Sequence, residues 1–306
     1  MTIATPRVAV GALIGATAAF WLSPAFAHAV CGDRIFPATL AIDDPGVNDE
    51  LALPTLTYLP RNSDGAQEFD GSFSWSKTIT PNVALVIQDG PTWLKPGGYG
   101  WDSLSTELQW GNFCLPDHEL MATVGFEVDW ANTATGSQAT PYNVYQPVID
   151  IGKGFGDLPT SLNILRPFAL TAELSESLPG QSLTNGSQNS TDINWGFTVQ
   201  YSLPYYNSHV AAIDNEFFKH LVPIAEFAFS KPLYNFGPGG NQTTGTFQPG
   251  AVFITDKWQF ALEAVVPMNS ASGRGVGVVG QLDLYLDDLL PDTIGKPLLT
   301  AFTGGK

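Results

Sequence analysis

The stretch LMATVGFEVDWAN, residues 120–132, alternates apolar and polar side chains with a period of two. One set contains Ala122, Val124, Phe126, Val128 and Trp130, and the other contains Thr123, Gly125, Glu127 and Asp129. Side chains on a β-strand point alternately to its two faces, so this stretch predicts a strand with one apolar and one acidic face. The acidic face meets either bulk water, as on a half-buried sheet, or the lumen of a barrel whose apolar face contacts lipid.

The beginning of the chain has the features of a secretory signal peptide. Arg7 supplies a positive charge, an apolar run covers residues 8–22, and Ala25 and Ala27 fit the small-residue pattern of a cleavage site. The apolar run is too short for a comfortable membrane-spanning helix. We therefore expect cleavage after Ala27, with Ala29 as the alternative, and a mature chain that functions outside the cytosol.

The composition narrows the class of protein. The chain has 306 residues, of which 14% are charged and 12% aromatic, with 31 Gly and a net charge of −16. This combination argues against a disordered chain and against a helical bundle. We expect no nucleic acid partner, because its phosphates would be repelled. No second apolar run is long enough for a spanning helix, which leaves spanning by β-strands open.

Alternating segments recur along most of the chain, and we count about twelve of them between residues 50 and 288. Clear examples are EFDGSFSWSK (68–77), NVALVIQD (82–89), SLSTELQW (103–110), FALTAEL (168–174), WGFTVQYSL (195–203) and GQLDLYLDD (280–288). Short and long connections alternate, as do the periplasmic turns and external loops of outer-membrane barrels. The connection formed by residues 204–220 is long, although a short turn is expected at this position. They either carry a small periplasmic helix or mark an error in the strand count.

Two all-β architectures fit this pattern. The polar faces contain hardly any Lys, and the apolar faces carry Trp near the predicted strand ends, at Trp75, Trp110, Trp130, Trp195 and Trp258. Aromatic girdles of this kind are typical of membrane barrels. We predict a transmembrane antiparallel up-and-down β-barrel in a bacterial outer membrane. The alternative is a secreted or periplasmic soluble β-sandwich that binds a ligand and keeps these aromatics in its core.

The segment GKGFGDLPTSLNILRPFAL, residues 152–170, together with the signal peptide and the alternating strands, resembles a known class of Gram-negative outer-membrane barrels. These barrels are grouped with meta-pathway phenol-degradation proteins and described as transporter-like. The resemblance is one of architecture over residues 50–290. It implies passive transport, no catalytic motif, and insertion by the barrel-assembly machinery. The chain departs from such barrels at its end, because Phe302 is not the last residue, so the assembly signal is altered or a tail follows the last strand.

On this basis we divide the chain into four parts: a signal peptide (1–27), a periplasmic N-terminal segment (28–50), the β-barrel (51–290) and a C-terminal tail (291–306). Seven acidic residues fall on the predicted polar faces: Glu107, Glu127, Asp129, Glu173, Glu226, Glu263 and Asp283. In a closed barrel they share one lumen, and an acidic lumen favours cations. We therefore predict a channel for small cationic or neutral solutes. The alternative is a set of separately solvated acids without a joint role.

A second acidic group lies near the two ends of the barrel segment. It consists of Asp43, Asp44, Asp49, Glu50, Asp287, Asp288 and Asp292. If both ends are periplasmic, these residues meet at one rim, where oxygen ligands could hold calcium. The spacing of an EF-hand is absent, and neither His118–Glu119 nor His209 and His220 have the spacing of zinc ligands. Solvated acids are therefore favoured, and we predict no metal and no cofactor.

Enzymatic function is not expected. Ser208 and His209 are similar to the Ser/His pairs of outer-membrane lipid hydrolases, which makes a hydrolase the third alternative. Neighbouring residues of a strand point to opposite faces, however, so the pair is not expected to make a nucleophile–base contact. The sequence also contains no Gly-x-Ser-x-Gly motif and no Walker motif.

The two cysteines predict one disulfide bond. Cys31 follows the cleavage site, and Cys114 lies in GNFCLPD, residues 111–117, which we expect to be a turn after a strand that ends at Trp110. Our strand count puts this turn on the periplasmic side, where conditions are oxidising. A bond between Cys31 and Cys114 would hold the N-terminal segment across or beside the barrel mouth. The alternative is a pair of free thiols.

Overall fold

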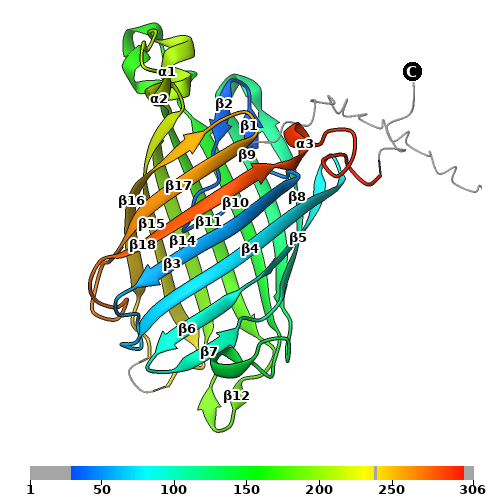
Figure 1. Cartoon of the computed structure of the whole chain (residues 1–306), viewed down its shortest axis with the longest axis vertical. Coiled ribbons are helices and arrows are strands. Elements are labelled where there is room, and N and C mark those ends of the chain that lie inside the picture. The colour runs from blue at the N-terminus through cyan, green and yellow to red at the C-terminus, as the bar shows by residue number, and fades with distance from the viewer. Residues whose placement is uncertain (1–28, 238–239, 300–306) are drawn as a thin grey trace, which may run out of the picture.

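A computed structural model describes residues 29–237 and 240–299 and shows a closed β-barrel (Figure 1). The predicted signal peptide and the region around Phe302 lie outside these residues. Within them, twelve antiparallel strands form the barrel wall. They are β3 (Glu50–Leu59), β4 (Gln67–Thr80), β5 (Val83–Asp89), β8 (Ser105–Leu115), β9 (Leu120–Asp129), β10 (Val144–Gly154), β11 (Phe168–Pro179), β14 (Thr191–Tyr201), β15 (Leu221–Tyr234), β16 (Thr244–Ile254), β17 (Trp258–Pro267) and β18 (Gly277–Tyr285).

Strand β3 closes the ring, because it pairs with β4 on one side and with β18 on the other. Leu56, for example, is in register with Gly71 of β4 and with Gly280 of β18. A closed ring pairs the backbone groups of every strand within the wall, which is the condition for crossing a bilayer with strands. The predicted fold class and strand number are confirmed, and the alternative of a soluble sandwich is wrong, since the wall is one closed sheet.

The even strand number brings the first and last described residues to one end of the barrel, which we call the terminal end (upper end in Figure 1). Turns here are short at residues 81–82 and 255–257, and η1 (Pro116–His118) links β8 to β9. The alternation of short and long connections predicts a short turn across residues 155–167, but this connection contains η3 (Thr160–Leu165). It folds back on itself because Nε of Arg166 donates a 2.7 Å hydrogen bond to the carbonyl of Gly156.

The long connection between β14 and β15 carries two short helices, α1 (Leu203–His209) and α2 (Glu216–Lys219). Both have capped N-termini, because Ser202 Oγ accepts from the N–H of Tyr205 and Asn215 Oδ1 accepts from the N–H of Phe217. The strand count was therefore correct, and this connection carries helices. A third helix, α3 (Leu286–Leu289), directly follows β18. In the described part of the chain, no helix has the length and apolar character needed to cross a membrane.

The opposite end, which we call the loop end, carries longer connections with small elements of their own (Figure 1). These are β6 (Pro91–Lys95), β7 (Gly98–Trp101), η2 (Gly136–Gln138), β12 (Leu183–Thr184) and β13 (Ser187–Gln188). Strand β6 pairs with the part of β4 that β5 leaves free, after a break at Gly90. Only glycine fits this break, because a Cβ there would lie 2.1 Å from the carbonyl oxygen of Gly71.

The outer surface of the wall is apolar, as the alternation in residues 120–132 predicts. Val124 and Phe126 are 41% and 49% exposed. The side chains on the other face of β9 point into the barrel, and Thr123 is only 2% exposed. Exposed apolar side chains of the same kind lie on neighbouring strands: Leu108, Trp110, Ile149, Ile151, Leu170, Leu174, Phe197, Phe260, Leu262 and Val278. An apolar band around a closed barrel matches the hydrocarbon region of a bilayer.

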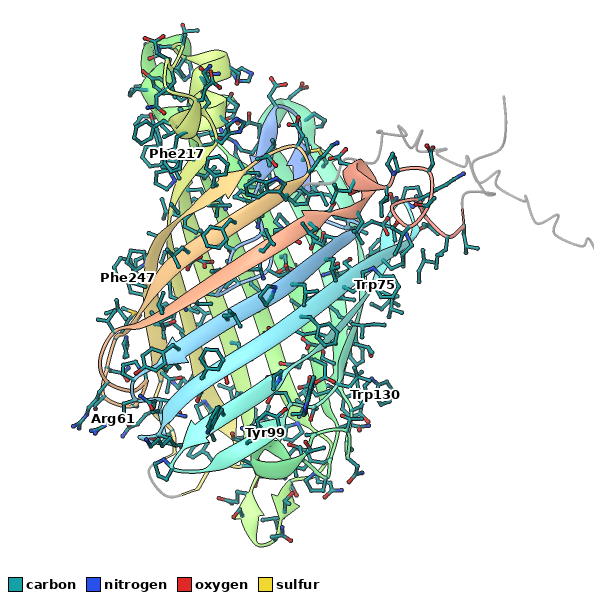
Figure 2. All side chains as sticks on the ribbon, in the orientation of Figure 1. Arg61, Trp75, Tyr99, Trp130, Phe217 and Phe247 are labelled. Carbon is teal, nitrogen blue, oxygen red and sulfur yellow. A yellow bond between two sulfur atoms is a disulfide. The ribbon has the colours of Figure 1, made fainter. Side chains whose placement is uncertain are left out.

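The positions of the aromatic residues differ in part from the prediction. Trp130 and Trp258 lie at strand ends, but Trp75, Trp110 and Trp195 lie well inside their strands, because β4, β8 and β14 are longer than the pattern indicates. Exposed aromatics gather instead on the loop-end hairpin, including Trp93, Tyr99 and Trp101. Figure 2 shows Tyr99 and Trp130 toward the loop end and Phe217 at the terminal end.

A short hairpin of β1 (Ala29–Cys31) and β2 (Arg34–Phe36) lies at the terminal end and is tied to the wall by the predicted disulfide bond. The Cα atoms of Cys31 and Cys114 are 5.7 Å apart. Cys114 belongs to the end of β8, and not to a turn after Trp110, because that strand continues beyond an irregularity between Trp110 and Phe113. The disulfide is confirmed, and with it the placement of Cys31 and Cys114 at one end.

Candidate functional site

The seven acidic residues of the predicted polar faces all lie on the inward side of their strands. Glu226, Glu263 and Asp283 are at most 1% exposed. The others are half-buried: Glu107, Glu127, Asp129 and Glu173. The alternation is misleading at the end of β18, because in residues 280–288 it predicts that Leu286 lies on the outward face with Leu282 and Leu284. The strand ends at Tyr285, and Leu286 is the first residue of α3 and is buried.

Two cavities in the barrel interior form a path from the loop end, and we call them together the vestibule. The outer cavity, of about 270 Å³, is lined by loop-end residues such as Asp102 and Gln138, and the inner one has a volume of about 420 Å³. Gln88, Ser105 and Glu127 line both cavities, so the two are continuous along one side of the wall.

The lining of the vestibule carries charge of one sign. Nine acidic residues line it: Asp43, Glu50, Asp89, Asp102, Glu107, Glu127, Asp129, Glu173 and Asp283. Among the described residues that line it there is no Lys, Arg or His. Negative charge inside low-dielectric walls raises the local concentration of cations. The structure thus brings five of the seven predicted acids to one vestibule, whereas Glu226 and Glu263 are buried outside its lining.

Residues 37–49, which join β2 to β3, run into the barrel at the terminal end, and we call them the plug. The N–H groups of Leu40 and Ala41 donate to Oε2 of Glu226 at 2.9 and 3.0 Å. The N–H of Asp43 donates to Oε2 of Glu173 at 3.1 Å. Two of the predicted acids therefore hold the plug through its backbone, a role that the alternation of the strands does not reveal.

Other strands hold the plug by its carbonyl groups and by packing. Gln259 Nε2 donates to the carbonyl of Ala38 at 2.8 Å, and Thr123 Oγ1 donates to the carbonyl of Pro45 at 2.6 Å. Leu40 also packs on a buried apolar cluster of inward residues. That cluster consists of Val222, Ile224, Val252, Ile254, Ala261 and Tyr285. The plug is thus fixed to both halves of the wall and forms the floor of the vestibule.

The acids of the plug have different environments. Asp49 pairs with Nζ of Lys77 and accepts from the hydroxyl of Thr78. Among residues 29–237 and 240–299, Asp43 and Asp44 have no cationic partner, and burial raises the pKa of both carboxyl groups. For Asp44 the pKa is well above its ordinary value, because the neighbouring carboxylate of Asp43 adds to the effect of burial.

A buried ion pair anchors the hairpin that precedes the plug. Arg34 is fully buried, and its guanidinium lies 3.1 Å from Oε2 of Glu119. It also donates to the carbonyl of Pro167 at 3.0 Å and lies 4.0 Å from the ring centroid of Tyr205. Together with the Cys31–Cys114 bond, these contacts fix one end of the plug. Sequence reasoning missed Arg34 and considered Glu119 only beside His118, since the ion pair joins residues 85 positions apart.

The second acidic group is brought together only in part. Asp287 interacts electrostatically with Asp49 and with Glu50, so the two ends of the barrel segment do meet at one rim. Across residues 29–237 and 240–299, no group of three or more His, Cys, Asp or Glu side chains is arranged to hold a metal ion. Burial and the nearby carboxylate of Asp256 raise the pKa of the Asp288 carboxyl group, and Lys257 opposes this shift.

The Ser208–His209 pair makes a contact that the sequence reasoning did not expect. The two residues lie at the end of α1 and not in a strand, so their side chains can meet, with 2.8 Å between Ser208 Oγ and His209 Nδ1. His209 Nε2 also lies 3.3 Å from Oδ2 of the exposed Asp33. However, Ser208 Oγ lies 3.0 Å from the carbonyl of Pro204, and neither residue of the pair lines the vestibule.

No family model matches the chain, and no curated protein matches it. Solved barrels have a similar overall arrangement. The NanC porin shares 7% identity with a TM-score of 0.46, over 76% of this chain and 98% of that chain. The KdgM porin in complex with disordered oligogalacturonate shares 9% identity with a TM-score of 0.44, over 76% and 97%. LpxR from Salmonella typhimurium shares 11% identity with a TM-score of 0.42, over 77% and 99%.

The chain is a barrel of the bacterial outer membrane. This conclusion rests on the closed ring of twelve antiparallel strands and on the apolar band around it. The inward side of the same wall is polar and acidic, with Glu127 at the junction of the two cavities. The question raised by residues 120–132 is thereby answered, because the apolar face of that strand is the outer surface and its acids face the lumen.

Proposed function

We propose that the barrel is a channel for small cationic or neutral solutes, restricted at its terminal end by the plug. The observation that carries the proposal is the lining of the vestibule, which has nine acidic side chains and, among the described residues, no basic one. Rings of acidic side chains are a common means of favouring cations in pores. The inner cavity of about 420 Å³ is in the range of about 300–1,000 Å³ that suits a small molecule.

Passage requires the plug to shift or to be displaced. Its contacts with Glu173, Glu226 and Gln259 are a few hydrogen bonds from three separate strands. They lie between two fixed ends, the hairpin held by Cys31 and the pair of Asp49 with Lys77. A segment held in this way can move away from the wall while the hairpin stays attached. We therefore propose that residues 37–49 control the flow through the channel while the wall remains closed.

The proposal also includes a more specific assignment of the barrel to a class of transporters. We place the chain with the transporter-like barrels grouped with meta-pathway phenol-degradation proteins, on the resemblance over residues 152–170 and the barrel architecture. Its partners would be outer-membrane lipid, small solutes and the barrel-assembly machinery. No catalytic role is assigned to this barrel under the proposal.

The contact among Ser208, His209 and Asp33 makes a lipid hydrolase the competing function. A nucleophilic serine must present its Oγ to a bound substrate and to a stabilising oxyanion site. Here Ser208 Oγ bonds to the carbonyls of Pro204 and Tyr205 at 3.0 and 3.1 Å, within its own helix. These carbonyls are acceptors and would repel an oxyanion, so the geometry favours the channel.

The proposal is tested by the reversal potential of the purified protein in a planar bilayer under a KCl gradient. We expect preference for K⁺ over Cl⁻, in the wild type and in a Glu226→Ala variant whose plug is loosened. Anion preference, or no conductance in either protein, would contradict the proposal. His209→Ala is the matched control, because it removes the competing hydrolase and should leave conductance and selectivity unchanged.

A further inference from the structure

Three hydrogen-bond acceptors in the inner cavity have no partner. They are Oε2 of Glu50, Oε1 of Gln281 and Oδ1 of Asp283. All three residues line the same cavity. Asp283 is only 1% exposed, so its free oxygen is shielded from bulk solvent. Buried acceptors without partners are unfavourable, and their number in native proteins is small. Three of them at one place therefore point to a ligand.

The pairing of β3 with β18 explains why these groups converge. Glu50 is in register with Tyr285, and Asp283 is in register with Ala52. Glu50 and Asp283 are thus diagonal neighbours on the inward face, a separation that long side chains can bridge. Gln281 lies two residues before Asp283 and so shares its face. An irregularity in the pairing between Gln281 and Asp283 lies at the same place.

The orientation of the Gln281 amide is fixed by the wall. Its Nε2 donates a 2.8 Å hydrogen bond to Oγ1 of Thr55 on β3. The amide therefore directs its donor into the wall and leaves Oε1 as an acceptor without a partner. The site offers two carboxylate oxygens and one amide oxygen. A ligand that satisfies it must supply hydrogen-bond donors and positive charge, and no acceptors.

We propose that this cluster of Glu50, Gln281 and Asp283 binds the primary ammonium group of a small organic amine. The three N–H donors of an ammonium group match the three free acceptors one to one. Calcium requires six to eight oxygen ligands, and the described residues contain no group of three or more acidic, His or Cys side chains placed to hold a metal. The inference deepens the proposed function and rests on it, since it names the class of cation that the vestibule selects.

The plug contributes to this site through its charge. The carboxylates of Asp43 and Asp44 interact electrostatically with Glu50 and Asp283 across the floor of the vestibule. A bound ammonium group would reduce the repulsion between the wall and the plug. The site therefore lies where an amine entering from the loop end meets the segment that closes the channel.

The test compares two cations of equal charge on the purified wild-type barrel in detergent, by isothermal titration calorimetry. Propylammonium has three N–H donors, and tetramethylammonium has none. We expect propylammonium to bind at least about tenfold more tightly, a difference of about 1.4 kcal/mol. Equal affinities would overturn the inference, because they would indicate attraction by the acidic field alone. Since this comparison uses the wild type, it is decisive even if a variant fails to fold.

Variants locate the site. Asp283→Asn and Gln281→Leu should each weaken propylammonium binding by about tenfold. Glu216→Gln is the matched control, because it removes one carboxylate from α2, outside the lining of both cavities, and should change the affinity by less than about twofold. Heat-dependent mobility on a detergent gel verifies that each variant is folded. An equal loss of propylammonium affinity in all three variants would overturn the assignment of the binding site to Glu50, Gln281 and Asp283.

The two proposals fail in different ways. A cation-selective channel that binds propylammonium and tetramethylammonium equally would refute the ammonium site and leave the proposed function in place. An anion-selective barrel that nevertheless prefers propylammonium would refute the channel proposal and leave the site.

Discussion

The N–H of Leu40 donates a 2.9 Å hydrogen bond to Oε2 of Glu226, a residue that follows it by 186 positions. The same carboxylate oxygen accepts from the next N–H of the plug, and Oε1 accepts from Thr198 of the neighbouring strand at 2.8 Å. Glu226 therefore joins the wall to the plug, and its charge strengthens both backbone hydrogen bonds.

Glu226→Gln should loosen the plug. Loss of charge-assisted hydrogen bonds weakens its docking by about 1–3 kcal/mol, because the amide can accept but carries no charge. The expected results are higher conductance and faster labelling of a cysteine introduced at Ala41. Glu127→Gln is the control, since Glu127 accepts from Ser105 of the wall and makes no hydrogen bond with the plug. Equal labelling in the two variants would contradict the role of Glu226.

Conductance should rise with pH through the plug acid Asp44. Burial raises the pKa of its carboxyl group well above the ordinary value, with added effects of Asp43 and Asp283. The docked plug thus holds a proton that the released plug gives up near its ordinary pKa. Docking is strongest below the ordinary pKa and weakens as the pH rises toward the raised pKa. Conductance measured from about pH 4 to about pH 8 should show this increase, and Asp44→Asn should flatten it. A fall in conductance with rising pH would contradict the predicted direction of the pH dependence.

Reduction of the disulfide should destabilise the protein and free the hairpin. The bond closes a loop between residues 83 positions apart, for which the chain-entropy model gives on the order of 4 kcal/mol. We expect Cys31→Ser/Cys114→Ser to lower the free energy of unfolding in urea toward this amount. A reductant should have the same effect on the wild type and none on the double variant. A wild type insensitive to the reductant would show that the bond is absent from the folded protein.

Charge on the outer surface should be far more costly than charge in the lumen. Val124→Arg places a guanidinium in the apolar band and should cost about 2–4 kcal/mol if it lies near the bilayer midplane. Glu127→Arg on the same strand faces the vestibule and should cost much less. The change in the free energy of unfolding caused by each substitution is to be measured by unfolding titrations in lipid vesicles. Thr123 is unsuitable as the inward control, although the alternation suggests it, because it is buried beneath the plug.

Selectivity should depend on the vestibule and not on every inward acid. The double change Glu127→Gln/Asp129→Asn should lower the K⁺ over Cl⁻ permeability ratio, since both residues line the outer cavity. Glu263→Gln should have little effect, because Glu263 is buried outside the lining of both cavities. Reversal potentials under a salt gradient measure both. If Glu263→Gln has the larger effect, the conducting path differs from the vestibule.

The sequence by itself determined the class of fold and the sidedness of the wall. Alternation with a period of two is a local property, so residues 120–132 already separate Val124 from Glu127. Repetition of the pattern predicts a wall of about twelve strands, and a single pair of cysteines in an exported chain predicts the Cys31–Cys114 bond. The boundaries were less accurate, because β8 continues past Trp110 to Leu115 and β18 ends before Leu286.

Only the tertiary structure decided how the lumen is closed and where its acids act. The plug binds Glu226 and Glu173 through its backbone N–H groups. Every residue type except proline has such a group, so the pattern of side chains does not predict these contacts. The pairing of β3 with β18 brings Glu50 beside Asp283 after more than two hundred intervening residues. The physical reason is that alternation determines only the face of the strand on which a side chain lies. Ring closure and strand register determine how far along the barrel axis that side chain lies and which residues it contacts.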